Sequence, residues 1–136
     1  MGRVIDLADL EAALNASPFH RFLGLRLERA ARGEVAVAMA FRDEFLAGPE
    51  NPYIHGGVIA SLIDTAACFA VIAGVGRDVP TLDLRVDYLR PAGRERLQAV
   101  GRMIKGGRTV AVADVEVLGA DQRAIAVGRG LFSTKE

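Results

Sequence analysis

Hydrophobic positions follow a helical spacing near the start of the chain and then alternate with polar or small residues. Leucines at positions 7, 10 and 14 share one face of a helix, which the segment 15–18 should end. Residues 23–30 alternate leucine with glycine or charged residues, and after a turn at Gly33 residues 34–41 alternate again. This pattern predicts a hairpin, followed by a loop at 42–54 that carries a glycine and two prolines.

Residues 55–74 form the longest apolar run, which is too long for a strand and contains one carboxylate, Asp64. The run predicts a buried helix. Four strand-like runs follow it, separated by turns that contain glycine. These runs are 81–90, 94–104, 109–118 and 123–132.

This order of elements has one economical packing, in which an antiparallel sheet curls around the long helix. We therefore predict an α+β hotdog fold, with a long central helix wrapped by a curved antiparallel sheet of about six strands. Residues 1–136 should form one domain, with residues 1–18 as a helical extension. Alternating apolar side chains of the run 81–90 should pack on the helix; they are Leu82, Leu84, Val86 and Tyr88.

Charge and composition exclude several classes of function. Seventeen basic residues balance seventeen acidic ones without forming a stripe, so we expect no nucleic-acid partner. Cys68 is the only cysteine, which favours a reducing compartment, the cytoplasm. The first apolar stretch contains acids, unlike a signal peptide. No cluster of Cys, His and Asp has metal-ligand spacing, so we expect no metal.

The long apolar helix also has to be weighed as a membrane span. Residues 58–75 number 18, close to the shortest length that crosses a bilayer. Asp64 at the midpoint would cost about 2.5–3.5 kcal/mol there. We therefore expect a buried helix and no membrane partner.

Asp64 shares its helix face with a stripe of small residues, which leaves room for a ligand or a second chain. The stripe contains Gly57, Ala60, Ser61, Ala67 and Cys68. Ser61 and Cys68 are therefore candidate substrate-lining residues, although Cys68 also fits a small core residue. The alternative for Asp64 is that it accepts hydrogen bonds from Ser61 or Thr65, or lies on an exposed rim.

The helix begins His55-Gly56-Gly57, with two poor helix formers in its first turn. Backbone N–H groups there lack intrahelical partners, and the helix dipole is positive. Without Cβ atoms these donors are open to an oxygen, as in a site that polarises a carbonyl. A plain turn is the alternative, with His55 as a cap or a hydrogen-bonded core residue.

Gly57 and Asp64 are seven residues apart, which corresponds to about 10 Å along a helix axis. One carbonyl group cannot lie near both. If both act on the same acyl carbon, they belong to two antiparallel copies of the helix. The spacing therefore predicts a homodimer, or a dimer of dimers, with a shared site.

The segment NPYIHGGVIASLIDTAACFAVIAG and the strands after it resemble the hotdog-fold acyl-CoA thioesterases of the phenylacetic-acid-degradation (PaaI-type) group. The resemblance covers roughly residues 20–133. It rests on the HGG, an acid nine residues after the histidine, a polar residue opening the next strand, Y-x-x-P-A and a Gly-Gly-Arg turn. It implies hydrolysis of acyl-CoA to a free acid and CoA, with no cofactor besides the CoA of the substrate.

The resemblance also implies roles for individual residues. Asp64 matches the catalytic acid, either a general base on water or a nucleophile. Gly57 matches the N–H that polarises the thioester carbonyl, and His55 matches an orienting group. Thr81 matches the residue that positions water, although a threonine opening a strand needs no function. Asn51 is the match for the family's asparagine, but it lies four residues before the histidine rather than six.

Three further residues are candidates for substrate binding. Gly56 shares the open first turn with Gly57. Arg90 and Arg108 lie at a strand end and a turn, where they can meet the phosphates of CoA or serve as ordinary surface charges.

Two other functions fit the same fold. A hotdog enoyl-thioester hydratase or dehydratase would usually pair a catalytic histidine with an acid at other spacings, and we find no such pair. A non-catalytic acyl-thioester binding module would bind acyl-CoA without releasing thiol. Assays of enoyl-CoA hydration and of thiol release separate these alternatives from hydrolysis.

Overall fold

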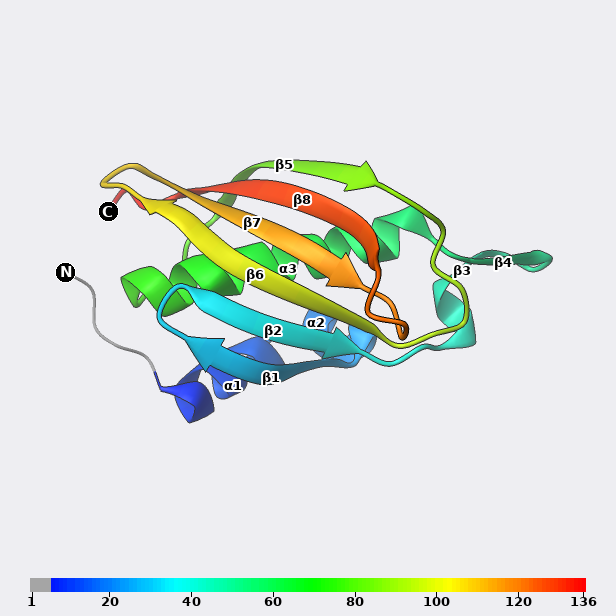
Figure 1. Ribbon diagram of the computed structural model, residues 1–136. Helices are drawn as coiled ribbons and strands as arrows, with labels where there is room; N and C mark the ends of the chain where they lie inside the picture. Colours follow the sequence, from blue (N-terminus) through cyan, green and yellow to red (C-terminus); the bar gives the residue numbers. More distant parts are fainter. Residues whose placement is uncertain (1–5) are drawn as a thin grey trace.

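The computed structural model describes residues 6–136 as one curved sheet wrapped against one long helix (Figure 1). Two short helices come first: α1 (Leu7–Ala16) and α2 (Pro18–Leu23). They are followed by β1 (Leu25–Ala31), β2 (Glu34–Met39), a 3-10 turn (Asp43–Phe45), β3 (Leu46–Gly48), β4 (Asn51–Ile54) and α3 (Gly56–Val75). The last strands are β5 (Thr81–Tyr88), β6 (Leu97–Gly106), β7 (Val110–Leu118) and β8 (Ala124–Ser133).

The main sheet has six antiparallel strands in the order β1-β2-β6-β7-β8-β5. Its inner face curves over α3, and β1 and β5 form its two edges (Figure 1). The predicted hotdog architecture is therefore confirmed, with a central helix and an antiparallel sheet of six strands.

Helix α3 lies close to the sheet at two glycines, through its backbone at one and through a side chain at the other. A Cβ atom at Gly101 of β6 would lie 2.5 Å from the carbonyl oxygen of Ala66, and one at Gly128 of β8 would lie 2.6 Å from Ile63 Cγ2. By length and composition α3 resembles a membrane span, yet 67% of its apolar window is buried inside the protein. Packing under the sheet therefore accounts for its hydrophobic character.

The two N-terminal helices pack against the sheet edge and α3. Leu10 and Leu14 of α1 are fully buried, which agrees with the predicted helix. The sequence pattern missed α2, which Ser17 caps at its start and which ends where Gly24 adopts a left-handed conformation with φ 71°. Residues 1–5 of the predicted extension lie outside the described part of the chain.

The segment expected to be a loop, 42–54, contains the 3-10 turn and a hairpin of β3 and β4. Each of these strands has only three or four residues, too few for a hydrophobic alternation to show. The hairpin extends beyond the end of the main sheet (Figure 1).

The prediction for the inward side of β5 is partly wrong. Leu84 and Val86 are half-buried against the core, but Leu82 is 58% exposed. The register with β8 shifts between Thr81 and Asp83, so Leu82 falls at an irregularity and loses the inward orientation. Tyr88 does reach α3, at its first turn, while 51% of the residue stays exposed.

Candidate active site

Asp64 lies midway along α3, half-buried, and faces the start of β5. The hydroxyl of Thr81, the first residue of β5, donates a hydrogen bond of 3.0 Å to Asp64 Oδ1. Within residues 6–136 no hydrogen bond reaches the second oxygen, Oδ2. The structure therefore brings these two predicted residues together and leaves one carboxylate oxygen available.

Neither of the neighbouring hydroxyl groups on α3 donates a hydrogen bond to Asp64. Ser61 Oγ donates to the Gly57 carbonyl at 2.9 Å, and Thr65 Oγ1 donates to the Ser61 carbonyl at 2.8 Å. The alternative in which these side chains satisfy Asp64 is therefore wrong. Ser61 stays on the same helix face as Asp64, with its hydroxyl turned toward the backbone.

The first turn of α3 is capped by His55. Its ring nitrogen Nδ1 accepts a hydrogen bond of 2.8 Å from the Gly57 N–H. The backbone N–H of His55 donates to the Phe45 carbonyl at 2.7 Å. A Cβ at Gly57 would lie 3.0 Å from that ring nitrogen, so the glycine makes room for the imidazole. His55 thus serves as the cap that the sequence allowed.

The two glycine N–H groups differ in availability. The N–H of Gly57 is engaged by His55, whereas the N–H of Gly56 donates to no group within residues 6–136. Tyr88 covers the other side of Gly56, because its Oη donates to the Gly56 carbonyl at 2.6 Å. Sequence reasoning gave Tyr88 a packing role on the helix but no role in the site, although Tyr88 opens the Y-x-x-P-A sequence.

Cys68 lies one helical turn beyond Asp64, and its thiol is unreactive. Its Sγ donates to the Val79 carbonyl at 3.5 Å. Burial, and then the charges of Asp64 and Asp78, raise the pKa of the thiol from 9.0 to about 12. The thiol therefore stays protonated at neutral pH, which fits a lining residue and not a nucleophile.

Gly57 and Asp64 belong to one unbroken helix, α3. Their separation of seven residues therefore corresponds to about 10 Å along the axis. Within a single chain, the first turn and the carboxylate cannot contact the same carbonyl group.

Asn51 lies apart from Asp64, in the hairpin that projects beyond the sheet (Figure 1). It is exposed, pairs with Gly48, and its Oδ1 accepts a hydrogen bond of 3.0 Å from the Tyr53 N–H. No hydrogen bond joins Asn51 to Asp64 or Thr81 within residues 6–136.

The two predicted phosphate-binding arginines have different surroundings. Arg90 is held by the β7–β8 turn, where it donates to the Ala124 carbonyl at 3.0 Å and pairs with Asp121 at 3.1 Å. Arg108 is exposed and lines a hollow at the other end of the sheet. Three more cations line that hollow: Arg32, Arg77 and Lys135.

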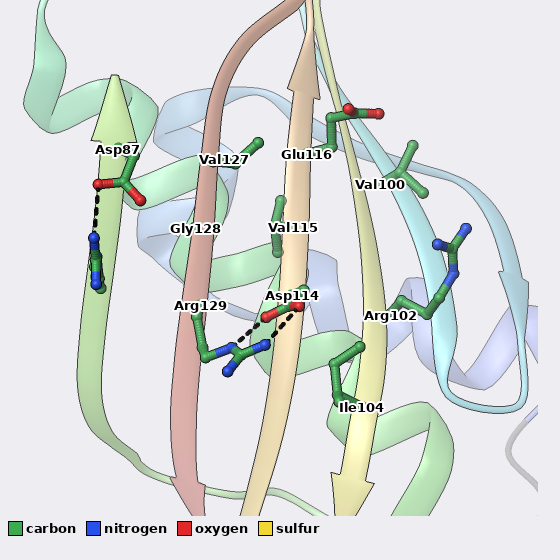
Figure 2. A pocket seen from close by; sticks show the side chains of 11 residues that line it. Asp87, Val100, Arg102, Ile104, Asp114, Val115, Glu116, Val127, Gly128 and Arg129 are labelled. Atoms are coloured by element: carbon green, nitrogen blue, oxygen red, sulfur yellow. Dashed lines mark hydrogen bonds and ion pairs between the residues drawn. The ribbon is translucent and has the colours of Figure 1, made fainter. Parts of the chain in front are cut away.

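A separate hollow lies on the outer face of the sheet, with α3 on the opposite side (Figure 2). Arg129 donates hydrogen bonds of 2.6 and 2.9 Å to the two oxygens of Asp114, which lower the pKa of that carboxyl. None of the predicted site residues lines this hollow. Within residues 6–136 no group of three or more His, Cys, Asp or Glu side chains is placed to hold a metal ion.

Comparison with known proteins identifies the family of this fold and site. The model of the thioesterase superfamily matches residues 51–126, which include every predicted catalytic residue. The chain belongs to the thioesterase superfamily. It is a thioester hydrolase, as the sequence predicted, because its relatives are named acyl-CoA thioesterases.

Individual members of the thioesterase superfamily support the assignment. The chain is 38% identical to a putative esterase of Halobacterium salinarum, over 82% of this chain and 80% of that protein. It is 35% identical to the medium/long-chain acyl-CoA thioesterase YigI of Escherichia coli, over 80% of each. The E. coli PaaI structure matches with a TM-score of 0.81 and 27% identity, over 90% of this chain and 87% of PaaI. The PaaI-type resemblance is thus confirmed.

Proposed function

We propose that this thioester hydrolase cleaves acyl-CoA to a free acid and CoA, with Asp64 as the catalytic carboxylate. The observation that carries the proposal is the Asp64–Thr81 pair. One carboxylate oxygen is held by the Thr81 hydroxyl at 3.0 Å, and the other has no partner within residues 6–136. A half-buried, oriented carboxylate with a free oxygen suits a base or a nucleophile.

In the general-base route, Asp64 Oδ2 takes a proton from water while the water oxygen attacks the thioester carbon. The C–S bond then breaks, and the CoA thiolate leaves and takes up a proton. In the nucleophilic route an oxygen of Asp64 attacks the thioester carbon, the C–S bond breaks and the CoA thiolate leaves and takes up a proton. Water then hydrolyses the resulting anhydride, which releases the free acid and regenerates the Asp64 carboxylate. Thr81 acts in both routes by fixing the orientation of the carboxylate.

Backbone donors at the first turn of α3 would stabilise the oxyanion on the thioester oxygen. The N–H of Gly56 is free, whereas the N–H of Gly57 already donates to His55 Nδ1. We therefore assign the polarising role first to Gly56, with the Gly57 N–H holding His55 in place. This moves the expected donor by one residue within the same turn.

The site is shared between two subunits, because one helix cannot bring its first turn and Asp64 to the same carbonyl. The exposed edge strand β5 supports pairing with a second copy, since its backbone is unpaired on one side and it begins at Thr81. Leu82 and Leu89 are exposed along the same edge. Asn51 would reach the site only from such a neighbouring subunit.

The phosphates of CoA need cations outside the reaction centre. Arg108 is free to serve them, in a hollow that also carries Arg32, Arg77 and Lys135. Arg90 forms an ion pair with Asp121 and stabilises the β7–β8 turn instead. A CoA substrate and a single unpaired cysteine both fit the cytoplasm, where we place the enzyme.

Thiol release from a panel of acyl-CoA esters tests the proposal. Wild-type protein should hydrolyse at least one ester, and Asp64→Asn should lower kcat by about a thousandfold or more because it removes the base. Asp83→Asn is the matched control, since Asp83 lies on the same strand as Thr81 and is exposed.

Three results would contradict the proposal. Retention of the wild-type rate by Asp64→Asn would show that Asp64 takes no part in the chemistry. Binding of acyl-CoA without thiol release would indicate a binding module. Hydration of enoyl-CoA without hydrolysis would indicate a hydratase.

A further inference from the structure

Tyr88 ends β5 with its ring against the first turn of α3. Its hydroxyl donates a hydrogen bond of 2.6 Å to the carbonyl oxygen of Gly56. A Cβ at Gly56 would lie 3.3 Å from the ring carbon Cζ, so the glycine lets the ring approach. Tyr88 therefore links the edge strand to the residues that cap the helix.

This hydrogen bond polarises the peptide group between Gly56 and Gly57. The carbonyl of Gly56 and the N–H of Gly57 belong to the same peptide, so a donor on the oxygen strengthens the N–H as a donor. That N–H donates to His55 Nδ1 at 2.8 Å. The Tyr88 hydroxyl and the His55 imidazole are thus connected through one peptide group.

The arrangement fixes where His55 carries its proton. A backbone N–H can only donate, so Nδ1 of His55 is the acceptor and the neutral ring is protonated on Nε2. His20 shows the opposite arrangement, because its Nδ1 lies 2.8 Å from the Leu14 carbonyl, which can only accept. The two histidines of the chain are therefore opposite tautomers.

We propose that Tyr88 is a positioning residue that holds His55 as the Nε2–H tautomer, with its ring fixed at the start of α3. The role rests on the thioesterase function proposed above. The Nε2–H of His55 and the free N–H of Gly56 then form two donors at the same helix end. Both favour negative charge on the thioester oxygen or the departing sulfur.

Tyr88→Phe tests the role because it keeps the ring against Gly56 and removes only the hydroxyl. Tyr53→Phe is the matched control, since Tyr53 is the only other tyrosine and is exposed on β4. Its hydroxyl makes no hydrogen bond within residues 6–136.

Nitrogen-15 NMR of the imidazole rings at about pH 8 reports the tautomers directly, because free histidines are neutral there. Wild-type protein should show His55 protonated on Nε2 and His20 on Nδ1. In Tyr88→Phe the His55 nitrogens should shift toward a mixture of tautomers, while the His20 nitrogens stay unchanged. His20 is thus an internal reference for structural damage.

Kinetics of acyl-CoA hydrolysis provide the second readout. Tyr88→Phe should lower kcat about tenfold, equivalent to about 1.4 kcal/mol, with KM within about twofold of wild type. Tyr53→Phe should leave kcat, KM and both tautomers unchanged.

The role is overturned by unchanged His55 nitrogens in Tyr88→Phe, or by a changed tautomer at the wild-type kcat. An equal loss of kcat in Tyr53→Phe overturns it as well. A wild-type protein that releases no thiol overturns the proposed function, and the positioning role with it, even when both tautomers are as expected. If the wild-type protein hydrolyses acyl-CoA and the His55 nitrogens are unchanged in Tyr88→Phe, only the positioning role of Tyr88 is overturned and the proposed function stands.

Discussion

Thr81 and Asp64 come from different elements and meet through one hydrogen bond of 3.0 Å. The bond has a charged acceptor, which makes it stronger than a neutral one. Because Thr81 is exposed, water competes for the same carboxylate oxygen. The main contribution of Thr81 is therefore the orientation of Asp64, with little effect on the stability of the fold.

Replacing Thr81 by valine keeps the shape of the side chain and removes the hydroxyl. We expect kcat to fall about tenfold, the scale of one hydrogen bond to a charged group. Thr81→Ser should recover most of that loss, because it restores the donor. Steady-state thiol release with all three proteins measures the effect, and a Thr81→Ser variant as slow as Thr81→Val would contradict it.

The buried thiol of Cys68 should make the free energy of unfolding depend on pH. Its pKa is raised from 9.0 to about 12, so the unfolded thiol loses its proton first as pH increases. The contribution of Cys68 to stability is therefore complete below about pH 9 and declines between about pH 9 and 12. Urea unfolding of wild type and Cys68→Ala across that range should show a flatter profile for the variant. Parallel profiles would contradict the expectation.

Among the elements, the contact of α3 with β6 depends on the absence of a side chain at Gly101. The strand crosses the helix so closely that a Cβ would lie 2.5 Å from the Ala66 carbonyl oxygen, a backbone atom that cannot turn aside. The sheet can therefore curve tightly over the helix only where such glycines lie on its inner face.

Gly101→Ala should lower the free energy of unfolding by about 1–3 kcal/mol, because the strand or the helix must move. Gly93→Ala is the control, since a Cβ there would meet only Glu95 Oε2 at an ordinary 3.7 Å. Its effect should be within about 0.5 kcal/mol. Urea denaturation compares the two, and equal midpoints would contradict the close approach.

The elements with a clear hydrophobic period were predictable, and those built by local capping were not. The long helix and the last four strands follow from alternation and apolar length alone. By contrast, α2 depends on a cap by Ser17, and the β3–β4 hairpin is too short to alternate. Asp64 and Thr81 were each expected as site residues from the family pattern, and Tyr88 was expected to pack on the helix. The hydrogen bonds that join Thr81 to Asp64 and Tyr88 to Gly56 were not predicted, because each depends on a contact between distant segments.

At the scale of the whole molecule, each proposed site takes Asp64 from one subunit and the first turn of α3 from another. Gly56→Pro probes that turn, because it removes the N–H at the first helical position, where proline is tolerated. Its Cβ would lie 3.3 Å from Tyr88 Cζ, so the Tyr88 ring must shift by a few tenths of an ångström. His55 already has the extended conformation that precedes a proline, with ψ 134°. Each variant alone should therefore be folded and nearly inactive.

Mixing Asp64→Asn with Gly56→Pro should restore activity. A mixed dimer has one site with both defects and one site with neither, so random exchange should recover ~25% of the wild-type rate. Subunits are exchanged by unfolding and refolding together, and thiol release is measured against each variant refolded alone. No recovery, with mixed dimers detected by native mass spectrometry, would contradict a shared site.

The unbroken course of α3 also restricts how related chains can differ in length. One residue inserted between Gly57 and Asp64 would turn the carboxylate by about 100° around the helix axis, away from Thr81. The β3–β4 hairpin projects past the sheet and is under no such restriction. Insertions and deletions among homologues should therefore collect in that hairpin and the strand turns, while the count from His55 to Asp64 stays fixed.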